Sequence, residues 1–395
     1  MARILFVVFS GGGNLPPSMG IARALMARGH AVTFAGDPEM MPRMRPTPFR
    51  ALELTEAYAQ LDHYPAMPLA PVACYLTSPA VEAQLRGVLE SEDPDFVLVD
   101  FMFFAAVHQV MRSGRPRAVM AHMAFHRVLD AFRGIAADFN AMRTGAGFDT
   151  LPSFDQLLLS GERVIVTSLG AIDRASRANA GAGNVCHVGP VLDMEAHASP
   201  LRLPWTSAQV KPLILVSFST DPVQADPGLI QRALDALADL DVYVVATIGG
   251  GVEPGKLSAP ANALVVDAAD HDDLMAKAAL VISHGGHGTT MRALKHGVPL
   301  LVMPGFVPDQ APNGAMVAEF GAGRVLAQQA DVATIRAAAH DLIAEPGYRA
   351  RASEVARLFA ESDSAATAAD EVEALLASAQ ARVGVPREAA RRAHG

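Results

Sequence analysis

The stretch ALVISHGGHGTTMRALKHGVPLLVMPG, residues 279–305, combines an apolar run, a glycine-rich turn, a segment of helical period and a second apolar run. Continuous apolar runs of this length are typical of strands buried on both faces of a parallel sheet. A helix between two such strands lets the second strand return parallel to the first. The stretch therefore predicts an open α/β sheet, in which ligands bind at the carboxyl ends of the strands.

The same alternation occurs in two blocks of the 395-residue chain. Helical segments separate ILFVVF, AVTFAG, FVLVD and RAVMAH in the first block, and PLILVSFS, DVYVVATI and NALVVDA begin the second block after residue 210. We therefore predict an α/β fold with two Rossmann-like, doubly wound parallel-sheet domains that face each other across a cleft. The expected divisions are an N-terminal domain at 1–195, a linker at 196–210, a C-terminal domain at 211–378 and a basic tail at 379–395.

Composition restricts the class of protein. A hydrophobic content of 51% can supply a core for each of two domains, and a net charge of -9 argues against a nucleic-acid or anionic-membrane partner. The apolar stretch 96–111 is interrupted by Asp100 and falls short of the ~18 residues of a membrane span. Cys74 and Cys186 lack the spacing of a disulfide framework or a zinc site. We expect a cytoplasmic monomer or homodimer that acts on small molecules.

The turn after the strand ALVIS is suited to hold an anion. A helix N-terminus presents unpaired N–H groups, His284 can donate from its imidazole, and the hydroxyls of Thr289 and Thr290 add donors. A tight turn with a capping threonine would contain the same glycines. However, Asp309 follows 25 residues after His284, with Gln310 next to it, and the next strand would bring them beside the turn. Such an acid–amide pair is suited to bind several sugar hydroxyls.

Residues 283–310, SHGGHGTTMRALKHGVPLLVMPGFVPDQ, resemble the donor signature of inverting nucleotide-sugar glycosyltransferases of the GT-B fold, the family of the antibiotic, macrolide and UDP-dependent glycosyltransferases. Further matches over nearly the whole chain are NLPPSMGIARALMARGHAVTFAG, VTS, HVGPV and VSFST. The resemblance implies transfer of a sugar from a UDP- or dTDP-sugar to a small lipophilic acceptor such as a natural product. A catalytically degenerate, glycosyltransferase-like binding or auxiliary protein is the alternative.

Carried onto this sequence, the resemblance makes His284 a ligand of the donor diphosphate, and Asp309 and Gln310 ligands of the sugar hydroxyls. The other donor-site residues that it implies are Ser219, Thr220, Gly285, Gly286, His287, Gly288 and Thr289. It implies no obligatory metal and no cofactor besides the nucleotide-sugar co-substrate. The sequence is consistent with this, because no aspartate-rich metal motif occurs in a loop that would suit one.

Two departures from the family pattern concern the nucleotide. Many relatives carry Trp and Pro in the segment that stacks on the base, whereas VVDAADHDDLM has Ala268 and Asp270 there. Base recognition would then rely on backbone contacts. The ribose-binding glutamate of the plant enzymes aligns with Arg292, so the resemblance does not decide between UDP and dTDP.

Asn14 stands where many relatives have the histidine that removes the proton of the acceptor, with Pro17 holding the proline of that pattern. An asparagine cannot accept this proton. Three accounts are open: Asp100, which ends FVLVD, is the base; His122 or His126, after the next strand, is the base; or the acceptor is acidic, like a phenol, and orientation by Asn14 suffices. Asp100 could instead cap the helix that follows it.

The pH dependence of turnover would separate these accounts. An unperturbed carboxylate base gives an acid limb near about 4, and a histidine base gives one near about 6.5. Three further histidines, His63, His108 and His187, have no partner in the sequence, and we expect them to be structural or surface residues.

Overall fold

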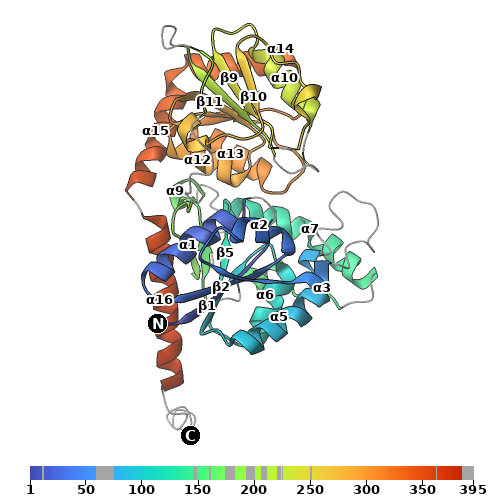
Figure 1. Cartoon of the computed structure of the whole chain (residues 1–395), viewed down its shortest axis with the longest axis vertical. Helices are drawn as coiled ribbons and strands as arrows, with labels where there is room; N and C mark the ends of the chain where they lie inside the picture. The colour runs from blue at the N-terminus through green and yellow to red at the C-terminus, as the bar shows by residue number, and fades with distance from the viewer. Residues whose placement is uncertain are drawn as a thin grey trace.

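The computed structural model contains two α/β domains stacked along the long axis of the molecule (Figure 1). The structure describes residues 1–10, 13–58, 75–145, 149–159, 162–173, 183–192, 201–205, 211–219, 224, 226–249, 251–361 and 363–384. Each domain is built on one parallel sheet, which confirms the predicted fold class. Among the helices described, none combines the length and apolar character that a membrane span requires.

The N-terminal sheet has the strand order β3-β2-β1-β4-β5-β6-β7. Its strands are β1 (Arg3–Val8), β2 (Ala31–Gly36), β3 (Arg50–Glu53), β4 (Phe96–Asp100), β5 (Arg117–Ala121), β6 (Val164–Val166) and β7 (Val185–His187). Strands β1, β4 and β5 are neighbours, so their carboxyl ends lie at one edge of the sheet. This adjacency brings together the polar residues that follow these three strands.

The C-terminal sheet has the order β10-β9-β8-β11-β12-β13. Its strands are β8 (Leu213–Ser217), β9 (Tyr243–Thr247), β10 (Ala263–Val266), β11 (Ala278–Ser283), β12 (Leu300–Val302) and β13 (Gly323–Val325). Strand β12 pairs in parallel with β11, with Ser283 opposite Val302. The loop after β12 therefore leaves the sheet beside the glycine-rich turn after β11.

Helices cover both faces of both sheets. Those of the first domain are α1 (Leu15–Ala27), η1 (Pro38–Met40), α2 (Met41–Met44), α3 (Thr55–Tyr58), α5 (Pro79–Glu92), α6 (Phe104–Ser113), α7 (Phe125–Gly145), α8 (Phe154–Leu159) and α9 (Gly170–Asp173). The second part of the chain adds α10 (Pro227–Leu237), η4 (Pro254–Lys256), α11 (His271–Met275), α12 (His287–Lys295), α13 (Gln310–Phe320), α14 (Val332–Ala344), α15 (Pro346–Ala360) and α16 (Ser364–Gly384).

Alternate residues of each strand enter opposite cores. In β1, Leu5 and Val7 belong to one hydrophobic cluster, whereas Ile4 and Phe6 belong to the cluster on the other face. Burial on both faces explains why this strand is continuously apolar in the sequence.

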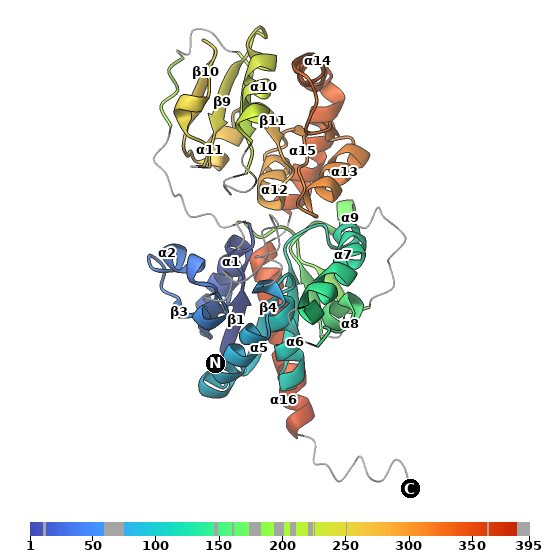
Figure 2. The ribbon, with the colours of Figure 1, turned by 90° about the vertical axis from the view of Figure 1, so that its right-hand side faces the viewer.

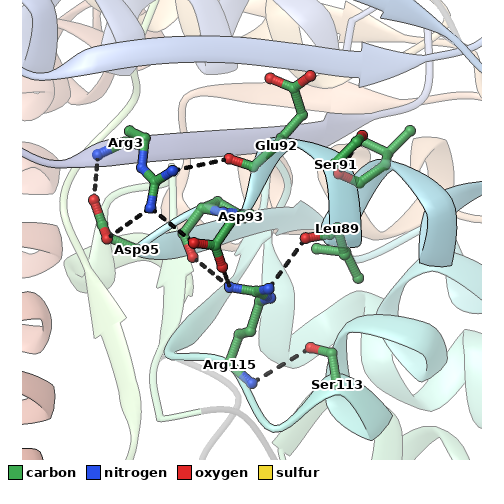
Figure 3. A network of polar contacts seen from close by, with 10 residues as sticks. Arg3, Leu89, Ser91, Glu92, Asp93, Asp95, Ser113 and Arg115 are labelled. Carbon is green, nitrogen blue, oxygen red and sulfur yellow. Dashed lines mark hydrogen bonds and ion pairs between the residues drawn. The ribbon is translucent and has the colours of Figure 1, made fainter.

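Ion pairs connect the amino-terminal edge of the first sheet (Figure 3). Arg3, at the start of β1, pairs with Asp93 and Asp95, and Arg115, just before β5, pairs with the same Asp93. Asp93 is the left-handed residue that ends α5, with a φ of 42°. The charged network thus lies at the edge where the strands begin, and the opposite edge carries the candidate site.

The last helix returns to the first domain. Figures 1 and 2 show α16 running along the N-terminal domain, where Val372 packs in the same cluster as Ile21 of α1. Arg28, which follows α1, pairs with Asp370 and Glu373. The expected C-terminal domain at 211–378 extends into this helix, although the helix packs on the other domain.

The expected linker at 196–210 is described only for residues 201–205, in which the Trp205 ring stacks on Tyr243 with centroids 4.4 Å apart. Of the expected tail at 379–395, residues 379–384 belong to α16 and the others lie outside the described residues.

Candidate active site

The glycine-rich turn joins β11 to α12 and lies close to the segment that begins α13. Gly285 has a φ of +87°, and a Cβ there would lie 2.7 Å from Val302 Cγ1 and 2.8 Å from the carbonyl oxygen of Gln310. Both the backbone angle and the space therefore require glycine at this position. The Gly285 N–H donates to the Ser283 hydroxyl at 3.2 Å.

His284 lies over Gly286, the residue that precedes the next helix. A Cβ on Gly286, the N-cap of α12, would be 2.7 Å from His284 Nε2, so glycine allows the imidazole to approach the helix N-terminus. Burial lowers the pKa of His284 to about 4, and the ring is therefore neutral at neutral pH. Its Nδ1 has no hydrogen-bond partner among the residues described. The turn thus places the His284 imidazole beside the N-terminus of α12, which is the positive end of the helix dipole.

Asp309 lies at the N-terminus of two helices. It is the N-cap residue of α13, and its carboxylate accepts hydrogen bonds from Asn313 Nδ2, at 3.3 Å, and from the His287 backbone N–H at the start of α12. Burial raises the pKa of Asp309 to about 6, although these hydrogen bonds favour its ionised form. Asn313 also donates to the Gly285 carbonyl at 2.8 Å. The acid is therefore tied to the turn that carries His284.

Gln310 is 3% exposed, and its carboxamide already has protein partners. Its Oε1 accepts from the Gly305 N–H at 2.7 Å, and its Nε2 donates to Gln224 Oε1 at 2.8 Å. The side chain thus connects the loop after β12 with the segment after β8. The structure places Asp309 and Gln310 beside the turn. Both the oxygen and the nitrogen of the Gln310 carboxamide are already hydrogen-bonded to the protein.

The ring of His287 is directed to the other domain. Its Nε2 lies 3.0 Å from the carbonyl oxygen of Thr167, which follows β6. A second contact between the domains consists of two hydrogen bonds from Arg127 of α7 to Glu319 of α13, at 3.0 and 2.8 Å. His287 was expected in the site of the nucleotide-sugar donor. Only its backbone N–H faces Asp309, and its imidazole contacts the other domain.

The remaining expected donor residues differ in their surroundings. A Cβ on Gly288 would meet no described atom within 4 Å, which leaves open space next to the first turn of α12. Thr289 is half-buried in the same turn, and Ser219 is half-buried after β8. Thr220 lies outside the described residues.

Three polar residues meet at the carboxyl edge of the first sheet. Asp100 ends β4, His122 follows β5, and Asn14 is the N-cap residue of α1, which follows β1. Asn14 donates a hydrogen bond to the Asp100 carboxylate, and Asp100 Oδ2 lies 3.7 Å from His122 Nδ1. All three side chains are buried, with exposures of 4% or less. This edge of the sheet thus places Asn14 beside the Asp100 carboxylate, which Asn14 can orient.

Asp100 does not cap α6, because the N-cap residue of that helix is Phe103 and no side chain caps it. Instead, Asp100 Oδ1 accepts from the Met102 N–H at 2.9 Å, in the turn between β4 and α6. Its Oδ2 has no hydrogen-bond partner among the described residues, since 3.7 Å to His122 is too long.

Burial reverses the order of the two titrations expected from the sequence. It raises the pKa of Asp100 to about 8, an effect that the hydrogen bonds from Met102 and Asn14 oppose and the charge of Asp37 increases. Burial, together with the nearby His287, lowers the pKa of His122 to about 3. The acid limbs expected near 4 and 6.5 are therefore wrong for these two groups, because each lies in a site that disfavours its charged form. His287 also contacts the first domain directly, through the Thr167 carbonyl.

His126, the other expected base, lies in a different cluster. Its ring centroid is 5.4 Å from that of His187, whose Nε2 is 2.6 Å from Asp173 Oδ2. The side chain of His187 is thus buried and paired, and His108 pairs with Glu82 at 3.2 Å. His63 lies outside the described residues.

Asp270 and Arg292, two residues that depart from the family pattern around the nucleotide, both make contacts with α11. Asp270 caps α11 by accepting from the N–H groups of Asp272 and Asp273, and Arg292 Nε pairs with Asp272 Oδ2 at 3.3 Å. Arg292 therefore joins α12 to α11. Ala268 lies between β10 and this cap.

A chain of polar residues at this edge was not predicted from the sequence. Thr247 Oγ1, at the end of β9, donates to Ser217 Oγ at 3.0 Å and lies 3.1 Å from His271 Nε2. Burial lowers the pKa of His271 to about 4. The sequence signal that could have revealed these residues is that Ser217 ends β8 and Thr247 ends β9, at the edge where ligands bind.

Known proteins resemble this chain in sequence and in fold. Residues 231–375 match the family model described as "Erythromycin biosynthesis protein CIII-like, C-terminal domain". The NDP-glycosyltransferase YjiC of Bacillus licheniformis is 24% identical over 93% of this chain and 96% of its own length. Among solved structures, the calicheamicin glycosyltransferase CalG4 has a TM-score of 0.75 and 24% identity, covering 95% of this chain and 98% of its own. The glycosyltransferase VinC, solved in complex with dTDP, has a TM-score of 0.69 and 18% identity, covering 95% and 100%.

The expected resemblance is confirmed both by sequence and by fold. The match extends over both domains, the two sheets are wholly parallel, and the relatives are glycosyltransferases. The chain is similar in sequence to nucleotide-sugar glycosyltransferases over nearly its whole length, and it has the GT-B fold of the antibiotic glycosyltransferases.

Proposed function

We propose that the chain transfers a sugar, with inversion at the anomeric carbon, from a UDP- or dTDP-sugar to a hydroxyl of a small lipophilic acceptor. The observation that carries the proposal is the meeting of two strand-end sites. The turn of α12 comes from the second domain, the Asp100–His122 pair comes from the first, and His287 contacts Thr167 between them. The dTDP complex of VinC supports a dTDP-sugar as one candidate donor.

The donor diphosphate would bind at the N-terminus of α12. The helix dipole, the N–H groups of the first turn beyond His287 and a neutral His284 N–H all favour a phosphate there. The open space at Gly288 gives the phosphate access to this turn. These groups would stabilise the negative charge that develops on the leaving diphosphate.

The sugar would lie against Asp309 and Gln310. Asp309 is partly exposed and retains capacity to accept from sugar hydroxyls besides its bonds to Asn313 and His287. The contribution of Gln310 would be to hold the loop at Gly305 in place, because its amide is already engaged. Asp309 is therefore the residue on which donor sugar binding should depend most.

We infer that Asp100 removes the acceptor proton. A base with a pKa of about 8 accepts a proton far more readily than His122, whose pKa is about 3. Asn14 would orient the carboxylate by its hydrogen bond and favour the ionised form. The acceptor oxygen would then attack the anomeric carbon on the side opposite the leaving diphosphate, and such a single in-line displacement inverts the configuration.

The surroundings of Asp100 favour an apolar acceptor. Met102 Sδ lies 3.8 Å from Asn14 Nδ2, and Phe9, after β1, has its ring 6.4 Å from that of Phe103. Met102 and Phe9 are partly exposed, whereas Phe103 is buried. An acceptor hydroxyl that reaches Asp100 would pass these apolar side chains, and Met102 would need to move to admit it.

Mass spectrometry of reaction mixtures tests this function. The full chain is incubated with UDP-glucose or dTDP-sugars and with phenolic and macrolide acceptors, and the product is examined for a hexose or deoxyhexose adduct. NMR of the anomeric proton in the product reports inversion or retention. We expect an inverted glycoside, and a retained configuration or the lack of product and of donor hydrolysis over the panel would contradict the proposal.

A further inference from the structure

Three side chains that are distant in the sequence converge outside the proposed donor and base sites. His126 lies in the first turn of α7, Asp173 ends α9, and His187 ends β7. One nitrogen or oxygen atom from each residue lies within 4.8 Å of the atoms from the other two. We call these three residues the His126 cluster.

The His126 cluster is buried and incompletely hydrogen-bonded. The Asp173 side chain is fully buried and that of His187 is 3% exposed. Asp173 Oδ1 and His187 Nδ1 have no hydrogen-bond partner among the described residues. Buried polar atoms without partners are costly, so these two side chains have hydrogen-bonding or ligand capacity that their contact with each other does not use.

We propose that the His126 cluster binds a divalent transition-metal ion of the zinc class. Two imidazoles and one carboxylate form a donor set that suits Zn²⁺ and its neighbours, and three protein ligands leave a position for water. His187 Nε2 and Asp173 Oδ2 are 2.6 Å apart, which is the spacing of a hydrogen bond. The cation would take the place of the shared proton, and the two groups would move apart to coordinate it.

The position of the cluster indicates a structural role for the metal. Leu169 and Ile172, on either side of the start of α9, belong to a hydrophobic cluster that also contains Met316 of α13. Asp173 is also close enough to affect His287, the residue that contacts Thr167. A metal here would join α7, α9 and β7 and thereby fix the surface of the first domain on which the second domain packs.

Zinc binding by the untagged, full-length chain tests the proposal. The protein is treated with a chelator and dialysed, and ZnCl₂ is then titrated by calorimetry, with Co²⁺ as a spectroscopic probe of the ligands. We expect a single equivalent of zinc to bind with micromolar or tighter affinity, and the temperature of unfolding to rise on addition of zinc. Visible d–d bands of Co²⁺ should appear in parallel.

Two variants and two controls locate the site. His187→Gln and Asp173→Asn keep the size of the side chains and should lose at least tenfold in zinc affinity, together with the thermal shift. His296→Gln removes a histidine that pairs with Asp272 on the second domain, and His284→Ala removes the proposed diphosphate ligand. Both controls should bind zinc like the wild type.

The outcomes are distinct from those of the proposed function, because the readout needs no donor and no acceptor. Lack of stoichiometric binding by the wild-type chain would overturn the proposal and leave water as the group between the side chains. Binding that both cluster variants retain would also overturn it. If one of these variants does not fold, the other variant and the wild-type Co²⁺ spectrum still decide the matter.

Discussion

Asp100→Asn removes a titratable proton from the buried end of β4 and keeps the size of the side chain. In the folded chain, burial raises the pKa of Asp100 from 3.8 to about 8. Between pH 3.8 and about 8, Asp100 therefore keeps its proton in the folded chain but has released it in the unfolded chain. The stability of the wild type therefore falls as pH rises through this window, and the asparagine variant lacks this loss.

The size of the effect follows from the width of the window. One pKa unit corresponds to about 1.36 kcal/mol, so between pH 6 and pH 8 the wild type should lose about 2–3 kcal/mol of unfolding free energy relative to the variant. His122 contributes with the opposite sign, because its lowered pKa stabilises the folded chain as pH rises from about 3 to 6.5. That window lies almost wholly below pH 6, and both proteins contain this histidine.

Urea denaturation at pH 6, 7 and 8 measures the difference. Asp239→Asn, which changes a carboxyl group whose side chain is 77% exposed, is the matched control and should follow the wild type at every pH. Turnover of Asp100→Asn should fall by roughly 10²-fold or more if Asp100 is the base. Wild-type turnover should rise with pH toward about 8. Parallel stability curves for wild type and Asp100→Asn would refute the raised pKa, and unchanged turnover would refute the assignment of the base.

Three other predictions concern the donor site, Asn14 and the domain contact. Asp309→Ala should weaken binding of a nucleotide-sugar more than binding of the nucleoside diphosphate in calorimetry, because only the former has sugar hydroxyls; equal losses would make Asp309 structural. Asn14→Ala removes a hydrogen bond to the ionised Asp100 and should move the acid limb of turnover to higher pH, so an unmoved limb would contradict the orienting role. His287→Ala should lower the unfolding free energy by about 1–3 kcal/mol, whereas Glu319→Gln, at an exposed ion pair, should cost less than about 1 kcal/mol. The reverse order in urea denaturation would show that the ion pair is the stronger contact.

The sequence predicted the sheets, and with them which strand ends lie side by side, for physical reasons that act locally. Strands such as ILFVVF and ALVIS are apolar throughout because both of their faces are covered, and the structure has β1 and β11 at these positions. Parallel pairing then places the ends of β4 and β5, and of β11 and β12, at common edges. The proximity of Asp100 to His122, and of His284 to Asp309, follows from this pairing.

Other features depend on contacts between distant segments and have no sequence signature. The pKa of Asp100 is set by burial under residues from several elements, so model values misplace it. The direction of the His287 ring depends on how the second domain meets Thr167. His126, Asp173 and His187 lack any short ligand spacing, and α16 returns to the first domain only because that domain offers it an apolar face at Ile21.

The rate of sugar transfer by His284→Ala tests the central claim most directly, because His284 is the side chain that should contact the leaving diphosphate at the N-terminus of α12. The matched control is His340→Ala on α14, where the side chain is 66% exposed. With a nucleotide-sugar and an acceptor that the wild type uses, we predict a loss of about 10²-fold in turnover for His284→Ala and wild-type turnover for the control. A folded His284→Ala protein with wild-type turnover would contradict the placement of the diphosphate in this turn.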